Sequence, residues 1–318
     1  MTLDVIIPTR DRPTQLAATL TALTRQTATD FGVVVVDDGG STPAESAVPP
    51  NISANLDIRF LRNDTARGPG PSRNRGIEAS SACDIVLIDD DCLAVPQLIE
   101  RHRAALQRHS SSVSLGPILS PPGQRLAVWN QWDADRLARE YARLADGSLA
   151  AAWHHLYTGN VGLRRADFVA VGGFDARFRR QEDMELGYRL GRAGCRFVFD
   201  AQAVVFHDSD RTLESWQRIP AASARFDVLM DRLDADSDRL SSVQAELRDK
   251  HWALRLVRSL IRTAGGRQHA ARAAMRAGRL LHGVRADRAG MAAMSVVWDL
   301  TYCEALREAM LDPEWSSR

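Results

Sequence analysis

The chain has 318 residues, of which 45% are hydrophobic and 25% are charged, and its formal net charge is +1. This composition excludes a wholly disordered chain, a collagen and a coiled coil, and the length suits one large domain or a catalytic domain with an appended region. The near-zero net charge by itself indicates neither a nucleic-acid partner nor a membrane partner.

The first third of the chain alternates between predicted strands and predicted helices. Short apolar or β-branched runs predict strands at Leu3–Pro8, Phe31–Val36, Leu56–Leu61, Asp84–Ile88 and Val113–Ile118. Helical spacing of apolar residues predicts helices at Pro13–Gln26, Pro71–Ser81 and Pro96–His109. Strands that alternate with helices form a largely parallel sheet with both faces covered, so we predict an α/β fold.

The remainder of the chain is predicted to be mostly helical. Residues 120–150 and Glu182–Ala193 are expected to form helices, and short strands are expected at Tyr157–Arg164, Phe197–Phe199 and Ala203–Phe206. From Leu213 onward helix predominates, with breaks expected near Pro220, Gly265 and Gly283. We therefore predict an α/β domain over residues 1–210 and a helical C-terminal region over residues 211–318.

Cysteine spacing and hydropathy indicate the cellular compartment in which the protein is expected. The four cysteines are scattered and lack the CxxC spacing of zinc and redox sites. No leader-like segment precedes the first predicted strand, and no apolar run reaches the ~18 residues of a spanning helix. We expect a cytoplasmic protein that is at most peripheral to the inner face of the membrane.

Acidic residues cluster where two predicted strands end. Asp37 and Asp38 follow one strand, and Asp89, Asp90 and Asp91 follow another. Ligands of open parallel sheets bind at the carboxyl ends of the strands, and crowded carboxylates there need a cation or hydrogen-bond donors. A divalent cation held by one or two carboxylates and by substrate phosphates fits this pattern. For either cluster taken alone, a solvated turn is the alternative.

A segment rich in glycine and arginine lies between the two clusters. Its sequence is Arg67-Gly68-Pro69-Gly70-Pro71-Ser72-Arg73-Asn74. The glycines allow close backbone approach, and the N-terminus of the following helix attracts anions. Arg67 and Arg73 can pair with phosphate or with the nearby aspartates. The patterns of a P-loop ATPase and of a Rossmann dinucleotide site are both missing.

Two further features carry side chains suited to catalysis or metal binding. Glu182 and Asp183 fall in the first turn of a predicted helix, where the helix dipole favours ionised carboxylates that can accept protons. His207 ends the last strand before the helical tail and is a candidate metal ligand. The alternatives are ordinary acidic residues at a helix start and a structural histidine.

Taken in order, these segments resemble a family 2 glycosyltransferase with the GT-A fold. The resemblance rests on VIIPTRDRP, VVVVDDGG, ARGPGPSRNRGIEAS, DIVLIDDDCLAVP, TGNVGLRR and GGFDARFRRQEDMELGYRLGRAG, followed by the strand that ends at His207. These segments occur in the family's order and cover residues 1–210, about two thirds of the chain. Each motif alone is weak, whereas the ordered series is specific.

The resemblance implies a nucleotide-sugar donor, Mn²⁺ or Mg²⁺ as cofactor, and transfer of a hexosyl or N-acetylhexosaminyl group to an acceptor hydroxyl. UDP is the family's default nucleotide, with dTDP and GDP as alternatives. The resemblance makes Asp183 the catalytic base, places Glu182 beside it to orient the acceptor, and assigns the metal to Asp91, Asp89 and His207. The implied donor-binding residues are Pro8, Thr9, Arg10, Asp38, Arg67, Arg73, Asp89, Asp90, Gly159 and Asn160.

Alternatives to this reading remain at the level of the sequence. A sugar nucleotidyltransferase can share the sheet architecture, but it would carry a Gly-rich basic loop after the first strand, unlike Pro8-Thr9-Arg10-Asp11. A non-catalytic sugar-binding relative would have lost acids that this chain keeps. The family implies inversion at the anomeric carbon, but GGFD followed by QEDMEL also resembles transferases that retain configuration.

The near-zero net charge conceals a basic segment in the helical region. Residues 248–288 carry eleven Lys or Arg and two acids, so the rest of the chain, with 30 basic and 38 acidic residues, has a charge of −8. The candidate explanations are a solvated helix face, an anionic membrane surface, a phosphorylated acceptor, pairing with the acidic catalytic domain, and a homodimer contact through residues 211–318. Basic residues interleaved with aromatics are missing, so nucleic-acid binding is not expected.

Overall fold

The computed structural model describes residues 2–178, 180–207, 211–234, 237, 239–261 and 263–312. The chain divides into two compact units, one of Met1–Gln124 with Leu137–Ser209 and one of Arg125–Arg136 with Asp210–Arg318. The boundary predicted after residue 210 falls beside residues 208–210, which lie outside the described residues. Among the described residues, no helix combines the length and apolar character needed to cross a bilayer.

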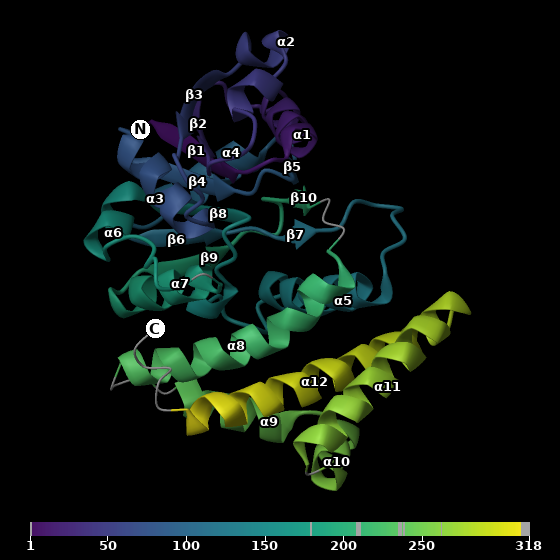
Figure 1. Cartoon of the computed structure of the whole chain (residues 1–318). Helices are drawn as coiled ribbons and strands as arrows, with labels where there is room; N and C mark the ends of the chain where they lie inside the picture. The colour runs from purple at the N-terminus through teal and green to yellow at the C-terminus, as the bar shows by residue number, and fades with distance from the viewer. Residues whose placement is uncertain are drawn as a thin grey trace. The chain divides into compact units, whose positions relative to one another are not determined.

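A mixed, mostly parallel sheet of seven strands forms the centre of the first unit (Figure 1). In spatial order its strands are β3 (Asp57–Arg62), β2 (Phe31–Asp37), β1 (Leu3–Thr9), β4 (Asp84–Ile88), β8 (Asn160–Arg164), β6 (Ser112–Leu115) and β9 (Arg196–Phe199). Only β8 runs antiparallel to its neighbours β4 and β6. The α/β fold with a mostly parallel sheet is therefore confirmed.

A second, three-stranded sheet brings together segments that are distant in sequence. It contains β5 (Cys92–Ala94), β10 (Val205–His207) and β7 (Ile118–Leu119). The prediction of one strand over Val113–Ile118 was wrong, because β6 ends at Leu115 and β7 belongs to the other sheet. Between them Gly116 passes so close to the Ala203 carbonyl that a side chain there would overlap it.

Helices cover both faces of the large sheet because strand residues alternate between the faces. The helices and 3-10 turns of this unit are α1 (Pro13–Leu23), η1 (Ala44–Ala47), α2 (Pro50–Ser53), α3 (Pro69–Ala79), α4 (Leu98–Gln107), η2 (Trp153–His155), α6 (Arg165–Ala170) and α7 (Glu182–Arg192). Val5 and Ile7 pack with α1 and the start of α4, whereas Ile6 packs with α3, α6 and α7.

The second unit is helical. Its elements are α8 (Leu213–Leu233), α9 (Arg239–Asp249), α10 (Trp252–Leu260), α11 (Ala264–Gly283) and α12 (Asp287–Leu311), together with the first part of α5 (Val128–Ala145). Trp132, Trp216 and Trp298 meet in its core with ring centroids 5.0–5.9 Å apart. The break predicted near Pro220 was wrong: α8 continues through this buried proline, held on both sides by the packing of its buried residues.

Helix α3 lies unusually close to the sheet because of Gly76. A Cβ atom at Gly76 would lie 2.5 Å from Ile6 Cγ2 and 3.0 Å from Val36 Cγ2, both in the fully apolar core. The missing side chain therefore fixes how near α3, and with it Arg73, approaches the ends of β1 and β2.

The Gly76→Ala variant should lose about 1–3 kcal/mol of stability, because the added methyl overpacks the interface between α3 and the sheet. Chemical denaturation followed by circular dichroism measures the loss. Gly265→Ala in α11 is the matched control, since a Cβ there meets nothing within 4 Å. Equal stability of the two variants would contradict the close packing of α3.

Candidate active site

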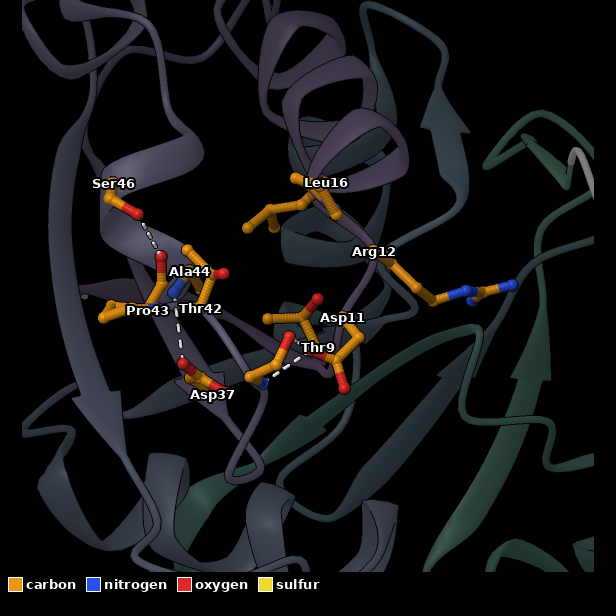
Figure 2. A pocket seen from close by; sticks show the side chains of 11 residues that line it. Thr9, Asp11, Arg12, Leu16, Asp37, Thr42, Pro43, Ala44 and Ser46 are labelled. Carbon is orange, nitrogen blue, oxygen red and sulfur yellow. Dashed lines mark hydrogen bonds between the residues drawn. The ribbon is translucent and has the colours of Figure 1, made fainter.

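A pocket of about 460 Å³ opens at the carboxyl ends of β1 and β2 (Figure 2). Its lining comes from the ends of these strands, the start of α1 and the loop that leads into η1. Asp37 shapes this loop: one carboxylate oxygen accepts the Gly40 amide at 2.8 Å, and the other accepts the Ala44 amide at 3.1 Å. The pocket walls are thus fixed by hydrogen bonds to the last residue of β2.

Asp38 holds the segment between β3 and α3. Its carboxylate accepts hydrogen bonds from the backbone amides of Arg67 and Gly68 at 2.9 and 2.8 Å, and from the side chains of Asn63 and Ser72 at 2.8 and 2.9 Å. Burial raises the pKa of this carboxyl, but the four hydrogen bonds outweigh burial and leave the pKa below its usual value. The structure thus gives Asp38 a role in fixing the loop that precedes α3.

Asp90 anchors the acidic loop after β4. Thr9 Oγ1 donates to Asp90 Oδ2 at 2.7 Å, Arg12 Nη1 donates to Asp90 Oδ1 at 2.7 Å, and Thr19 Oγ1 donates to the Asp90 carbonyl at 2.8 Å. Thr9 and Asp90 are therefore joined across neighbouring strands, as expected of residues at one sheet edge. Figure 2 shows the Arg12 side chain extending away from Thr42 and Pro43.

Asp91 and His207 face each other. Strand β10 pairs antiparallel with β5 so that His207 lies opposite Cys92, which places the His207 ring beside the acidic loop. His207 Nε2 lies 2.9 Å from Asp91 Oδ1, and the other carboxylate oxygen of Asp91 lies 2.8 Å from Arg12 Nη1. Asp91 Oδ1 is buried, and its neighbour in the site is the imidazole of His207.

These side chains fit a divalent cation. Ligand atoms of Asp91, Cys92 and His207 lie within 4.8 Å of one another. Burial and the neighbouring aspartates raise the pKa of the Cys92 thiol well above its usual value, so the unligated thiol is protonated. The buried carboxylate oxygen of Asp91 and the imidazole nitrogen of His207 are donors that can bind a divalent cation.

Arg73 connects the acidic loop to the start of α7. Its side chain is only 3% exposed, with Nη2 2.5 Å from Asp89 Oδ1 and Nη1 3.3 Å from Glu182 Oε1. The guanidinium also lies over the Phe174 ring, 5.8 Å from the centroid. Burial lowers the pKa of Arg73, but Asp89 and Glu182 outweigh it and raise the pKa overall. The guanidinium is thus a buried cation held between two acids.

The start of α7 is positioned by a glycine turn that is clamped from both sides. Gly172 and Gly173 have φ values of 84° and 69°, which only glycine adopts readily. Asn74 of α3 accepts the Phe174 amide and donates to the Phe174 carbonyl, both at 2.8 Å. Arg189 of α7 donates to the Gly173 carbonyl at 2.7 Å. The turn therefore sets the distance between α3 and α7.

Asp183 has the properties of a base that works near neutral pH. Burial and the neighbouring charge of Glu182 raise its pKa to about 7, against the lowering effect of a hydrogen bond from the Met184 amide and of the Arg73 charge. Asp183 Oδ1 accepts that amide at 2.9 Å. A carboxylate with a pKa near the working pH is suited to taking a proton from a hydroxyl.

Gly159 lies next to the acidic loop, and Asn160 follows it at the start of β8. A Cβ at Gly159 would lie 3.3 Å from Asp89 Oδ2, so glycine leaves the Asp89 carboxylate accessible at this point. The Asn160 side chain is buried, with Nδ2 donating to the carbonyls of Pro117 and Ala203 at 3.0 and 2.6 Å and Oδ1 2.9 Å from His102 Nε2. The structure gives Asn160 the role of holding β7 and β10 close to β8.

The predicted residues do not all come together. Thr9 is hydrogen-bonded to Asp90, and Arg73 joins Asp89 to Glu182, which precedes Asp183. In contrast, the side chains of Arg10 and Arg67 are exposed, and Pro8 lies within the paired part of β1 and β2. Arg12, which pairs with both Asp90 and Asp91, was not among the predicted site residues. Arg12 lies just beyond the Pro8–Asp11 segment already singled out, and that nearness was the available signal.

The first part of the chain is similar in sequence to known glycosyltransferases. Residues 4–172 match the model of glycosyl transferase family 2. Validoxylamine A glucosyltransferase of Streptomyces hygroscopicus subsp. jinggangensis is 31% identical over 223 residues, which cover 60% of this chain and 52% of the relative. Pre-mycofactocin glycosyltransferase of Mycobacterium tuberculosis is 27% identical over 222 residues, covering 67% and 44%. The chain spans about half the length of these curated relatives.

Solved structures share the fold. The mannosyltransferase PcManGT from Pyrobaculum calidifontis, in complex with GDP-Man and Mn²⁺, superimposes with a TM-score of 0.66 at 15% identity, covering 98% of this chain and 88% of that chain. Staphylococcus aureus TarS 1–349 in complex with UDP-GlcNAc gives 0.58 at 18% identity, covering 97% and 91%. Both likenesses confirm the predicted GT-A fold. With more than half of its length matched by the family model, this chain belongs to glycosyl transferase family 2.

Proposed function

We propose that this protein transfers a sugar from a nucleotide-diphosphate donor to an acceptor hydroxyl, with inversion at the anomeric carbon. The bridge made by Arg73 carries the proposal, because it ties the base candidate at the start of α7 to the acidic loop at the end of β4. A proton acceptor thereby lies beside the residues that would receive the donor.

The pocket at the ends of β1 and β2 is our proposed site for the nucleoside of the donor. Its volume of about 460 Å³ lies in the range of small-molecule sites. Structural neighbours hold UDP, UDP-GlcNAc or GDP-Man, and UDP remains our first choice of nucleotide, with GDP and dTDP as the alternatives. Thr9 lines this pocket and is hydrogen-bonded to Asp90, so pocket and acidic loop share a wall.

We propose that Asp91 and His207 hold Mn²⁺ or Mg²⁺, with Asp89 directed to the donor or the metal. When bound, the cation would neutralise negative charge on the leaving diphosphate. Arg12 already pairs with the Asp91 oxygen opposite His207, so this carboxylate is held in a fixed orientation towards the imidazole. The neighbour that contains Mn²⁺ is consistent with this choice of ion.

Asp183 is our proposed general base. Its carboxylate accepts the proton of the acceptor hydroxyl while that oxygen bonds to the anomeric carbon and the bond from this carbon to the diphosphate breaks. The electron pair leaves on the diphosphate, and a single displacement of this kind inverts the anomeric carbon. Glu182, held by Arg73, orients the acceptor hydroxyl towards Asp183.

Asp183→Asn should lower the transfer rate about 10²–10⁴-fold, since the amide cannot accept the proton. Donor binding, measured by calorimetry with UDP-sugars and Mn²⁺, should change little. Asp57→Asn, an exposed acid at the start of β3, is the control and should behave as wild type. Loss of donor affinity in Asp183→Asn would refute the assignment of Asp183 as base.

The transfer rate should fall on the acidic side of neutrality. The pKa of Asp183 is raised to about 7, so the fraction of ionised base decreases as the pH drops through this value. Well below it, kcat should decrease about tenfold per pH unit. Stopped assays over a pH series measure this limb, and circular dichroism at each pH controls for unfolding. A rate that stays level down to about pH 5 would show that another group takes the proton.

His207→Ala should weaken Mn²⁺ binding at least about tenfold, because the cation loses an imidazole ligand. Electron paramagnetic resonance of free Mn²⁺, titrated in the presence of UDP, measures this directly and without turnover. The control is His109→Ala, an exposed histidine that contacts Arg196. Equal Mn²⁺ affinities of the two variants would remove His207 from the metal site.

A further inference from the structure

Helix α10 turns an apolar face to solvent. None of its nine residues is buried, and Trp252, Leu256 and Leu260 are 63%, 48% and 73% exposed. Their spacing of four residues puts them on one side of the helix, which we name the α10 apolar face. On the other side, Arg258 donates to the Leu247 carbonyl at 2.5 Å and its Nε lies 3.3 Å from buried Asp299. The helix is therefore fixed to its unit by the side opposite the apolar face.

Exposed arginines lie close to this face in the chain and on α11, the next helix along the chain. Arg255 is exposed at the edge of the α10 apolar face, and Arg248 is exposed just before the helix. Helix α11 exposes Arg272, Arg276 and Arg279, which share one side of that helix. The whole segment 248–288 has a net charge of +9. Large apolar side chains with basic neighbours are the composition of helices that lie in a membrane interface.

We propose that the α10 apolar face binds the surface of an anionic lipid bilayer. The helix would lie in the plane of the interface, with Trp252, Leu256 and Leu260 among the lipid headgroups and upper acyl chains and the arginines on the lipid phosphates. Charge favours this occupant over a second copy of the chain, because a symmetric contact of this face would bring the exposed Arg248 and Arg255 of two copies close together. Membrane binding of this kind does not depend on the proposed transfer reaction.

Flotation with vesicles tests the proposal. The whole protein should bind vesicles of equal parts phosphatidylglycerol and phosphatidylcholine, and bind pure phosphatidylcholine at least about tenfold more weakly. The triple variant Trp252→Gln, Leu256→Gln, Leu260→Gln should lose at least about tenfold in affinity for the anionic vesicles. Val169→Gln, Met310→Gln, Leu311→Gln is the matched control, because these side chains are 58%, 48% and 73% exposed elsewhere on the protein.

The contribution of charge is tested with a second pair of variants. Arg272→Gln, Arg276→Gln, Arg279→Gln should lower the affinity for anionic vesicles about 100-fold at low salt, and added salt should shrink the difference. The matched control is Arg25→Gln, Arg108→Gln, Arg143→Gln, three exposed arginines of the first unit, which should bind as wild type. Thermal unfolding confirms that each variant is folded.

Three results would overturn the proposal. The first is failure of the folded wild type to bind anionic vesicles, and the second is equal loss of binding in the α10 variant and its apolar control. The third is sedimentation of the wild type as a dimer without lipid, with the α10 triple variant sedimenting as a monomer. That last result would assign the α10 apolar face to a second copy of the chain.

Discussion

The pairing of buried Arg73 with Asp89 and Glu182 is the interaction on which the arrangement of the site depends. A guanidinium that is 3% exposed must have anionic partners, because an unpaired buried charge is strongly destabilising. One partner comes from the end of β4 and the other from the start of α7, so the two acids cannot separate without taking at least one partner from the buried cation. The close contact of Gly76 with Ile6 brings Arg73 near both partners.

Each of the three consecutive aspartates of the acidic loop has a different partner and a different role. Asp89 pairs with Arg73, and Asp91 faces His207. Asp90, between them, accepts hydrogen bonds from Thr9 and Arg12 and anchors the loop. Because the anchor lies between the other two, a single short loop presents one acid towards α7 and one towards β10. This explains physically why a run of like charges is tolerated: each carboxylate has its own cationic or hydrogen-bonding partner.

Strand ends and the chemical type of the site could be predicted from the sequence, whereas the pairing of side chains could not. Buried strands are continuous apolar runs, so the aspartates that end them mark the sheet edge. Nothing in the sequence indicated that the Asn160 amide would donate to the carbonyls of Pro117 and Ala203. Nor did it indicate that Arg12 would pair with both Asp90 and Asp91. Such contacts depend on backbone geometry, including the positive φ of 53° at Asp11. The helices of the second unit were harder to predict from the sequence. Packing keeps α8 continuous at Pro220, where the proline predicted a break.

The separation in sequence between Arg73 and its partner Glu182 also limits where the chain can be truncated. Arg73 and Glu182 are 109 positions apart, and the match to the family model ends at residue 172. A fragment truncated there would retain every acid of the loop after β4, yet it would lack α7, β9 and β10. Its β6 edge would be unpaired on the side of β9, and its buried guanidinium would keep one counter-ion instead of two. The end of the family-model match is therefore not a folding boundary, and an expressed fragment has to extend through β10 to retain this core.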